Sequence, residues 1–190
     1  ITKKDILVID TGLGFCNDDG VLQIHQNLRA NGIDPGEVTK ILISHLHKDH
    51  SGGIAGKDKI TGSRILNFPN ATYFINKNEF ALATSQLSPS YIPEDFDILK
   101  NAKNVIFTEG DGDIDNYIQY LVTGAHCPYH QVFRIEEESE IIFFGGDVAP
   151  QLQHRKNRFI AKDAFDGTTS MQLRHEGWEQ GQKETWRFLF

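Results

Sequence analysis

The stretch that decides the fold is His45-Leu46-His47-Lys48-Asp49-His50, which places four metal-binding side chains within six residues. It follows Ile41-Leu42-Ile43, an apolar run that predicts a buried strand. His45 and His47 are two residues apart, so in extended backbone their side chains point to the same side and can share one metal ion. Asp49 and His50 follow where we expect the chain to bend, so they can face a second ion. Imidazole and carboxylate groups bind Zn²⁺, and also Fe or Mn.

Two later residues can supply the donors that this cluster lacks. His126 lies in Thr123–His130, a stretch that follows a predicted strand over residues 117–122. Asp147 directly follows another predicted strand, Ile141–Phe144, with Gly145 and Gly146 between them. His126 could complete the first metal site and Asp147 could bridge both ions. The structural alternatives are a loop histidine for His126 and a helix or turn cap for Asp147.

Strands and helices interleave along the whole chain, which predicts an α/β layered fold in one domain over residues 1–190. We expect Val105–Phe107 and Tyr117–Val122 to be strands around a hairpin, and Glu136–Glu138 to be a solvated turn. Residues 84–101 show no clear periodicity, and we consider them as a substrate-covering loop, or as a partner-facing or irregular surface loop. The remaining expected strands span residues 6–9, 72–75, 132–135 and 188–190, and the expected helices span residues 20–31, 77–83 and 168–186.

The composition is that of an ordinary globular protein, with 39% hydrophobic and 24% charged residues in 190. The net charge of -7 disfavours nucleic acid as a partner, because an acidic surface repels phosphate. Cys16 and Cys127 are too few for a disulfide framework and indicate free thiols in a reducing compartment. No apolar run approaches the roughly 18 residues that span a bilayer. We therefore expect a cytoplasmic protein that acts on a small molecule, although the chain begins at Ile1 rather than Met.

Together with Ile9-Asp10-Thr11-Gly12, these stretches resemble the successive motifs of the metallo-β-lactamase superfamily over roughly residues 6–154. The resemblance implies a four-layer αββα sandwich. It also implies that one metal ion is bound by His45, His47 and His126, and the other by Asp49 and His50, with Asp147 as a bridge. Two further stretches resemble the branch that contains quorum-quenching lactonases: Phe68–Ala71 with Glu79, and Gly146–Pro150 with His154.

The chain departs from the family pattern in two places. Ala125, Cys127 and Tyr129 stand at the small or hydroxyl positions of the family's Gly-His-Thr-Pro-Gly-His run, and we expect His130, its last histidine, to support the site by hydrogen bonding rather than bind metal. The family also has strands before the Asp-Thr-Gly turn and a last metal histidine near its C-terminus. The chain therefore looks trimmed at both ends. His154 and His175 are the late histidines, each either that ligand or a surface or supporting residue.

The resemblance implies a dinuclear metal-dependent hydrolase in which a metal-bridged hydroxide attacks an ester or lactone carbonyl, with an acyl-homoserine lactone first in line. Asp49 would be both ligand and catalytic residue, orienting the nucleophile or accepting its proton. A glyoxalase-II-like thioesterase is the alternative within the same chemistry. An iron-containing oxidoreductase of the same fold and a non-catalytic metal-binding remnant are alternatives of other classes, and a nuclease is disfavoured by the acidic charge.

Overall fold

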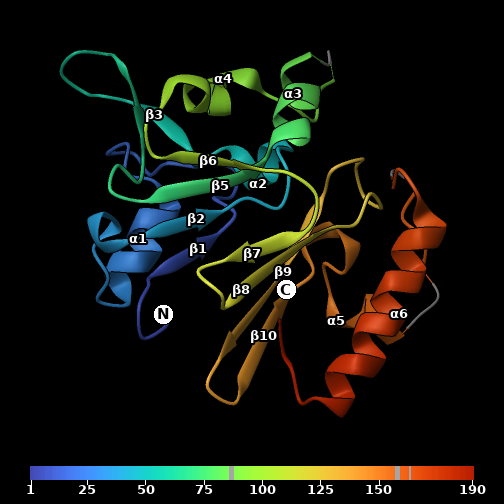
Figure 1. Cartoon of the computed structure of the whole chain (residues 1–190). Helices are drawn as coiled ribbons and strands as arrows, with labels where there is room; N and C mark the ends of the chain where they lie inside the picture. Colours follow the sequence, from blue (N-terminus) through green and yellow to red (C-terminus); the bar gives the residue numbers. More distant parts are fainter. Residues whose placement is uncertain (86–87, 157–158, 163) are drawn as a thin grey trace. The chain divides into compact units, whose positions relative to one another are not determined.

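The structure, a computed structural model, describes residues 1–85, 88–156, 159–162 and 164–190 (Figure 1). These residues form two compact units, Ile1–Thr108 and Glu109–Phe190. Each unit has its own main sheet. In the described part of the chain, no helix is both long enough and apolar enough to cross a membrane.

The first unit is built on a sheet of four parallel strands in the order β1 (Leu7–Ile9), β2 (Lys40–Leu42), β5 (Thr72–Asn76) and β6 (Val105–Thr108). Their centres are in register, with Val8 opposite Ile41, Ile41 opposite Tyr73, and Tyr73 opposite Val105. Parallel strands need apolar residues on both faces, and β2 and β5 supply them. The carboxyl ends of parallel strands meet at one edge, so the polar residues after β1, β2 and β5 gather there.

Helices and turns complete the first unit. Ile24 and Leu28 of α1 pack on the core, whose buried members include Ala83, Phe96 and Leu99. The helix α1 ends at Asn31-Gly32, where Gly32 adopts a φ of +77°. The elements between the strands are α1 (Gln23–Ala30), the 3₁₀ turn η1 (Pro35–Glu37), α2 (Lys48–Ser51), the hairpin of β3 (Ala55–Lys57) and β4 (Arg64–Leu66), α3 (Lys77–Ser85), α4 (Pro93–Phe96) and the 3₁₀ turn η2 (Asp97–Asn101).

The second unit is a five-stranded sheet with a long helix. Its strand order is β11-β10-β9-β8-β7, antiparallel except for the parallel pair of β10 and β11. Asp166 caps the helix α6 by accepting a hydrogen bond from the Thr169 backbone N–H. The elements are β7 (Gly112–Ile114), β8 (Ile118–Val122), β9 (Gln131–Glu137), β10 (Glu140–Phe144), the 3₁₀ turn η3 (Gly146–Val148), α5 (Leu152–Lys156), α6 (Gly167–Lys183) and β11 (Arg187–Leu189).

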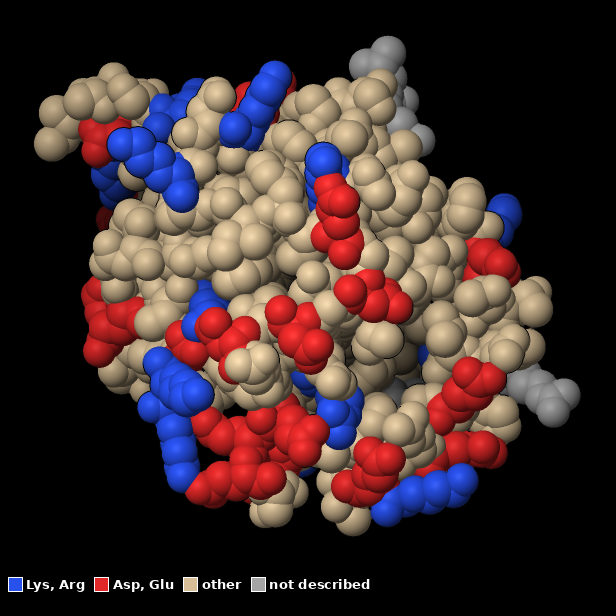
Figure 2. All heavy atoms as spheres, viewed as in Figure 1, with Lys and Arg blue, Asp and Glu red and all other residues tan. Residues whose placement is uncertain are grey.

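Of the acidic run Glu136–Glu138, which was predicted to be a turn, only Glu138 lies in the turn between β9 and β10, because Glu136 and Glu137 are the last residues of β9. Glu136 and Glu138 are exposed, and Glu138 adopts a left-handed φ of 56°. Acidic side chains gather in the lower part of the face shown in Figure 2, where Figure 1 draws this hairpin.

Two expectations about local structure were wrong. Val105–Phe107 is not part of a hairpin with Tyr117–Val122: β6 pairs in parallel with β5, and the hairpin consists of β7 and β8. The partner of β6 lies about 30 residues earlier in the chain, and β7 is only Gly-Asp-Ile, so neither has a local signal. The segment 84–101 is not irregular either, because it contains α4 and η2. Residues 86 and 87 of that segment lie outside the described part.

Candidate metal centre

In the first unit, three imidazole rings of the His45–His50 stretch lie against one another. The ring centroids of His45 and His47 are 4.5 Å apart, and those of His45 and His50 are 4.2 Å apart. His45 and the intervening Leu46 are fully buried, whereas His47 and His50 are partly exposed. The backbone is extended at His47, which begins α2, so His50 returns toward His45 within one helical turn. The rings of His45, His47 and His50 therefore lie together in this unit.

Asp10 and Ser44 fix two of the three rings. Asp10 Oδ2 lies 2.8 Å from His50 Nδ1, and Ser44 Oγ lies 3.0 Å from His45 Nδ1. Ser44 in turn donates its hydroxyl to Asp10 Oδ2 at 2.7 Å and its backbone N–H to Asp10 Oδ1 at 2.7 Å. When each Nδ1 donates to its partner, each Nε2 keeps its lone pair. A metal-binding histidine is held in this way by a carboxylate or hydroxyl behind it.

The backbone after β1 is pressed against the start of α2. Thr11 donates its backbone N–H to His50 O at 2.7 Å and its hydroxyl to the same oxygen at 3.0 Å. Gly14 has a φ of +71°, and a Cβ there would lie 2.2 Å from Gly52 O. Only glycine fits this left-handed conformation and this close approach. The turn that presents Asp10 is thereby fixed to the helix that carries His50.

Asp49 differs from the buried histidines in its exposure. Its side chain is 53% exposed, and its Oδ2 lies 3.6 Å from His50 Nε2. A carboxylate in this place can reach both solvent and the ring nitrogen that a metal ion would use.

The second unit places the other two expected donors side by side. His126 lies in the loop after β8 and Asp147 lies in η3 after β10, and His126 Nε2 is 3.3 Å from Asp147 Oδ2. The buried ring of His130 accepts a hydrogen bond from the Asp147 backbone N–H at 3.2 Å through Nε2, and its Nδ1 lies 3.1 Å from Thr123 Oγ1. Gly146 has a φ of +48°, and a Cβ there would lie 2.6 Å from His130 Nε2.

The start of α6 supports the same two donors. Phe165 donates its backbone N–H to His126 O at 3.0 Å, and Asp166 donates to Ala125 O at 2.8 Å. The buried guanidinium of Arg174 donates to Val148 O at 3.0 Å, one residue after Asp147. Burial lowers the pKa of Arg174 below its ordinary value. The helix is therefore a platform for the loop of His126 and the turn of Asp147.

Imidazole nitrogens with carboxylate oxygens are the donor set that zinc takes in hydrolytic sites, so the residues present fit a divalent metal ion. A family model described as the metallo-beta-lactamase superfamily matches residues 1–180. The chain belongs to the metallo-β-lactamase superfamily. It has the α/β fold of that superfamily, and its histidine-rich cluster is a candidate metal site.

Among its relatives is the N-acyl homoserine lactonase AttM of Agrobacterium fabrum strain C58, which is 30% identical over 145 residues covering 70% of the chain. Those residues are 49% of the relative, so the chain spans about half the length of the curated relatives it matches. A probable metal-dependent hydrolase from Staphylococcus aureus aligns with a TM-score of 0.81 at 18% identity, covering 97% of this chain and 69% of that one. AidC, a dizinc quorum-quenching lactonase in complex with a product, N-hexanoyl-L-homoserine, aligns with a TM-score of 0.76 at 22% identity. The alignment covers 100% of this chain and 69% of that one.

The other histidines of this metallo-β-lactamase-fold chain lie in different surroundings. His175 is 67% exposed on α6 and lies 3.5 Å from Glu179, which is a surface role. His154 stacks on Phe159 with ring centroids 4.8 Å apart. His25 packs edge-on against Phe68, and burial, with a smaller effect from Arg29, lowers its pKa. Cys127 is a buried cysteine that forms no disulfide.

The roles of Asp10 and Ser44 were missed by the sequence reasoning, which took Asp10 as part of a strand and turn. The available signal was a lone carboxylate directly after a buried strand, at the same sheet edge as the histidines.

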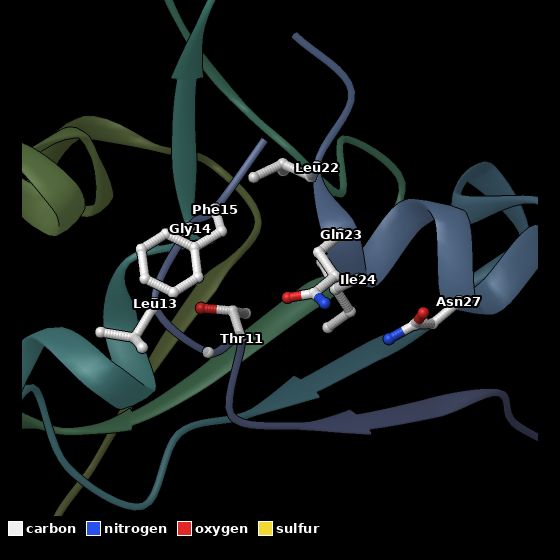
Figure 3. A pocket seen from close by; sticks show the side chains of 9 residues that line it. Thr11, Leu13, Gly14, Phe15, Leu22, Gln23, Ile24 and Asn27 are labelled. Carbon is white, nitrogen blue, oxygen red and sulfur yellow. The ribbon is translucent and has the colours of Figure 1, made fainter. Parts of the chain in front are cut away.

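The first unit also contains a pocket beside the turn of Asp10, with a volume of about 320 Å³. Figure 3 shows side chains from the loop after β1 and from the start of α1 facing this space. Thr11, whose backbone N–H binds His50 O, is part of its wall. The other lining residues are Gly12, Leu13, Gly14, Phe15, Leu22, Gln23, Ile24 and Asn27.

Proposed function

We propose that the chain is a hydrolase that binds two divalent metal ions, Zn²⁺ first, and cleaves an ester or lactone bond. One ion would be held by His45, His47 and His126, and the other by Asp49 and His50, with Asp147 as the bridge. The observation that carries the proposal is the fixing of His45 Nδ1 by Ser44 and of His50 Nδ1 by Asp10. Both bonds orient the opposite ring nitrogen for a ligand.

Zinc ions bound here would supply a water molecule that is deprotonated near neutral pH and a positive charge that polarises the attacked carbonyl. The protein's own groups hold that arrangement. Asp10 and Ser44 hold the imidazoles of His50 and His45 at Nδ1 and so orient them, and His130 fixes the backbone of Asp147. Asp49 is open to solvent on one side, so it can accept a proton from water and release it to the leaving alcohol.

The leading substrate candidate is an acyl-homoserine lactone. The support is the resemblance to N-acyl homoserine lactonases at about 30% identity. The pocket of Figure 3 offers largely apolar walls next to the Thr11–His50 contact, which suits the apolar part of such a molecule. Ring opening adds one water molecule and gives a carboxylate, an alcohol and one released proton.

The test is turnover by the metal-quantified protein on a panel of lactones, thioesters and phosphodiesters. We expect lactone hydrolysis, and we expect His47→Ala to abolish it together with bound metal. The matched control is His175→Ala, which removes an exposed histidine and should change neither. A His47→Ala protein that keeps its metal and its activity would refute the ligand assignment. Preferential thioester cleavage would favour the thioesterase, and bound iron with oxygen consumption would favour the oxidoreductase.

A further inference from the structure

A short segment of the first unit runs beside the metal-binding stretch without belonging to it. Lys48 donates its backbone N–H to Ser90 O at 2.8 Å, and His47 forms an isolated antiparallel bridge with Tyr91. The rings of His47 and Tyr91 have centroids 4.8 Å apart at an interplanar angle of 59°. The aromatic ring of Tyr91 therefore lies against the imidazole that is expected to bind metal.

A buried carboxylate holds this segment to the histidine stretch. Glu79, in the first turn of α3, is 0% exposed. Its Oε1 accepts the hydroxyl of Tyr91 at 3.2 Å and the backbone N–H of Leu46 at 3.0 Å. Burying a carboxylate is costly unless hydrogen bonds compensate for lost water. A single oxygen of Glu79 thus connects Tyr91 to the backbone between His45 and His47.

The direction of Tyr91 excludes a role as a substrate-covering residue. Its side chain is 6% exposed and belongs to the apolar core, and its hydroxyl reaches Glu79 rather than solvent. Phe96, from the same segment, is fully buried as well. Both aromatic residues of the segment 84–101 therefore face the interior of the first unit.

We propose that Tyr91 is a positioning residue that fixes the imidazole plane of His47, with Glu79 holding Tyr91 in place. The proposal rests on the proposed function, because it takes His47 as a metal ligand. Asp10 and Ser44 hold the other two imidazoles at Nδ1, and the ring of Tyr91 packs on that of His47 at 59°. A ring that can no longer rotate offers its nitrogen in one direction, which raises metal affinity by reducing the ordering that binding requires.

The test compares Tyr91→Leu with Phe96→Leu, measured as zinc affinity by chelator competition and as the visible absorption of the cobalt(II)-loaded protein. Both changes remove one buried aromatic ring from the same segment, but only Tyr91 contacts His47. We expect Tyr91→Leu to weaken zinc binding by about tenfold and to alter the cobalt spectrum. Phe96→Leu should lower the unfolding temperature and leave both metal readouts unchanged. Tyr91→Phe keeps the ring but loses the hydrogen bond to Glu79, so its zinc affinity should lie between that of Tyr91→Leu and that of the original protein.

Equal zinc affinities and identical cobalt spectra for Tyr91→Leu and Phe96→Leu would overturn the proposal. If Tyr91→Leu does not fold, Glu79→Gln is the second variant: its amide accepts more weakly, and an unchanged cobalt spectrum would again contradict positioning. His47→Ala distinguishes a failure of the ligand assignment from a failure of the positioning role. If its zinc affinity is unchanged, the ligand assignment itself fails and the positioning role with it. If its affinity is lost while Tyr91→Leu binds normally, only the positioning role fails.

Discussion

The substitution Asp10→Asn replaces one carboxylate oxygen by an NH₂ group at the centre of the histidine network and keeps the shape of the side chain. The Asp10 carboxylate accepts three hydrogen bonds, two from Ser44 and one from His50 Nδ1. In the variant, the amide oxygen still accepts the Ser44 backbone N–H. The NH₂ group then takes the place of Oδ2 and faces Ser44 Oγ and His50 Nδ1. His50 Nδ1 must then become an acceptor, so the ring proton moves to Nε2, the nitrogen that we expect to bind metal.

The size of the effect follows from these contacts. Loss of a group that orients a metal-binding histidine costs about 10–100-fold in metal affinity, or about 1.4–2.7 kcal/mol. A hydrogen bond to a charged group contributes about 1.5–3 kcal/mol to stability, so the metal-free variant should also unfold more easily. Ser44→Ala removes one of the bonds to Asp10 and the contact with His45, and it should give a smaller loss in both quantities.

The assay is zinc competition against a chelator of known affinity, paired with urea unfolding of the metal-free protein. The control is Asp18→Asn, which removes the same charge from an exposed position of the same unit and should change neither quantity. A folded Asp10→Asn protein that binds zinc within about twofold of the original would refute the reasoning, because the tautomer of His50 would then not depend on Asp10.

Three further predictions concern backbone contacts and a partly buried histidine. Gly14→Ala should destabilise the protein by about 1–3 kcal/mol more than Gly12→Ala. Both glycines have a φ of +71°, but a Cβ would meet backbone atoms only at Gly14. Equal free energies of unfolding for the two variants would contradict this prediction. Gly146→Ala should displace His130 from the Asp147 N–H and weaken zinc binding by about tenfold, whereas Gly124→Ala, with a φ of +59° and its nearest atom 3.5 Å away, should not. Because the pKa of His25 is lowered in the folded protein, the unfolded chain binds a proton at His25 at a higher pH than the folded protein does. The contribution of neutral His25 to the free energy of unfolding is therefore complete above pH 6.5 and decreases as the pH falls through that value. Urea unfolding at several pH values should show that the free energy of unfolding decreases less toward pH 5 for His25→Gln than for the original protein. The same pH dependence for both proteins would contradict this prediction.

The sequence predicted the histidine cluster well because its information is local. His45, His47 and His50 lie within six residues after a strand, so strand alternation and one helical turn determine which way they point. The placement of His126 beside Asp147 was implied by the family resemblance, and the two side chains do lie together in the second unit. The amphipathic pattern of residues 20–31 likewise predicted α1 and its glycine end.

The contacts that support the cluster had no comparable signal. Asp10 reaches His50 across 40 residues and Glu79 reaches Leu46 across 33, so each depends on how the parallel strands pair. The misplaced hairpin has the same origin, because the partner of β6 is chosen by the sheet and not by its neighbours in sequence. Tyr91 and Phe96 lacked periodicity, and only packing shows that they face inward.

The measurement that tests the central claim most directly is anomalous diffraction at the zinc edge from crystals of the zinc-supplemented protein. We expect two zinc peaks per chain: one about 2.0–2.1 Å from imidazole nitrogens of His45, His47 and His126, the other bound by Asp49 and His50, with an Asp147 oxygen between them. Zinc peaks at other side chains, or no peak at these six, would contradict the account.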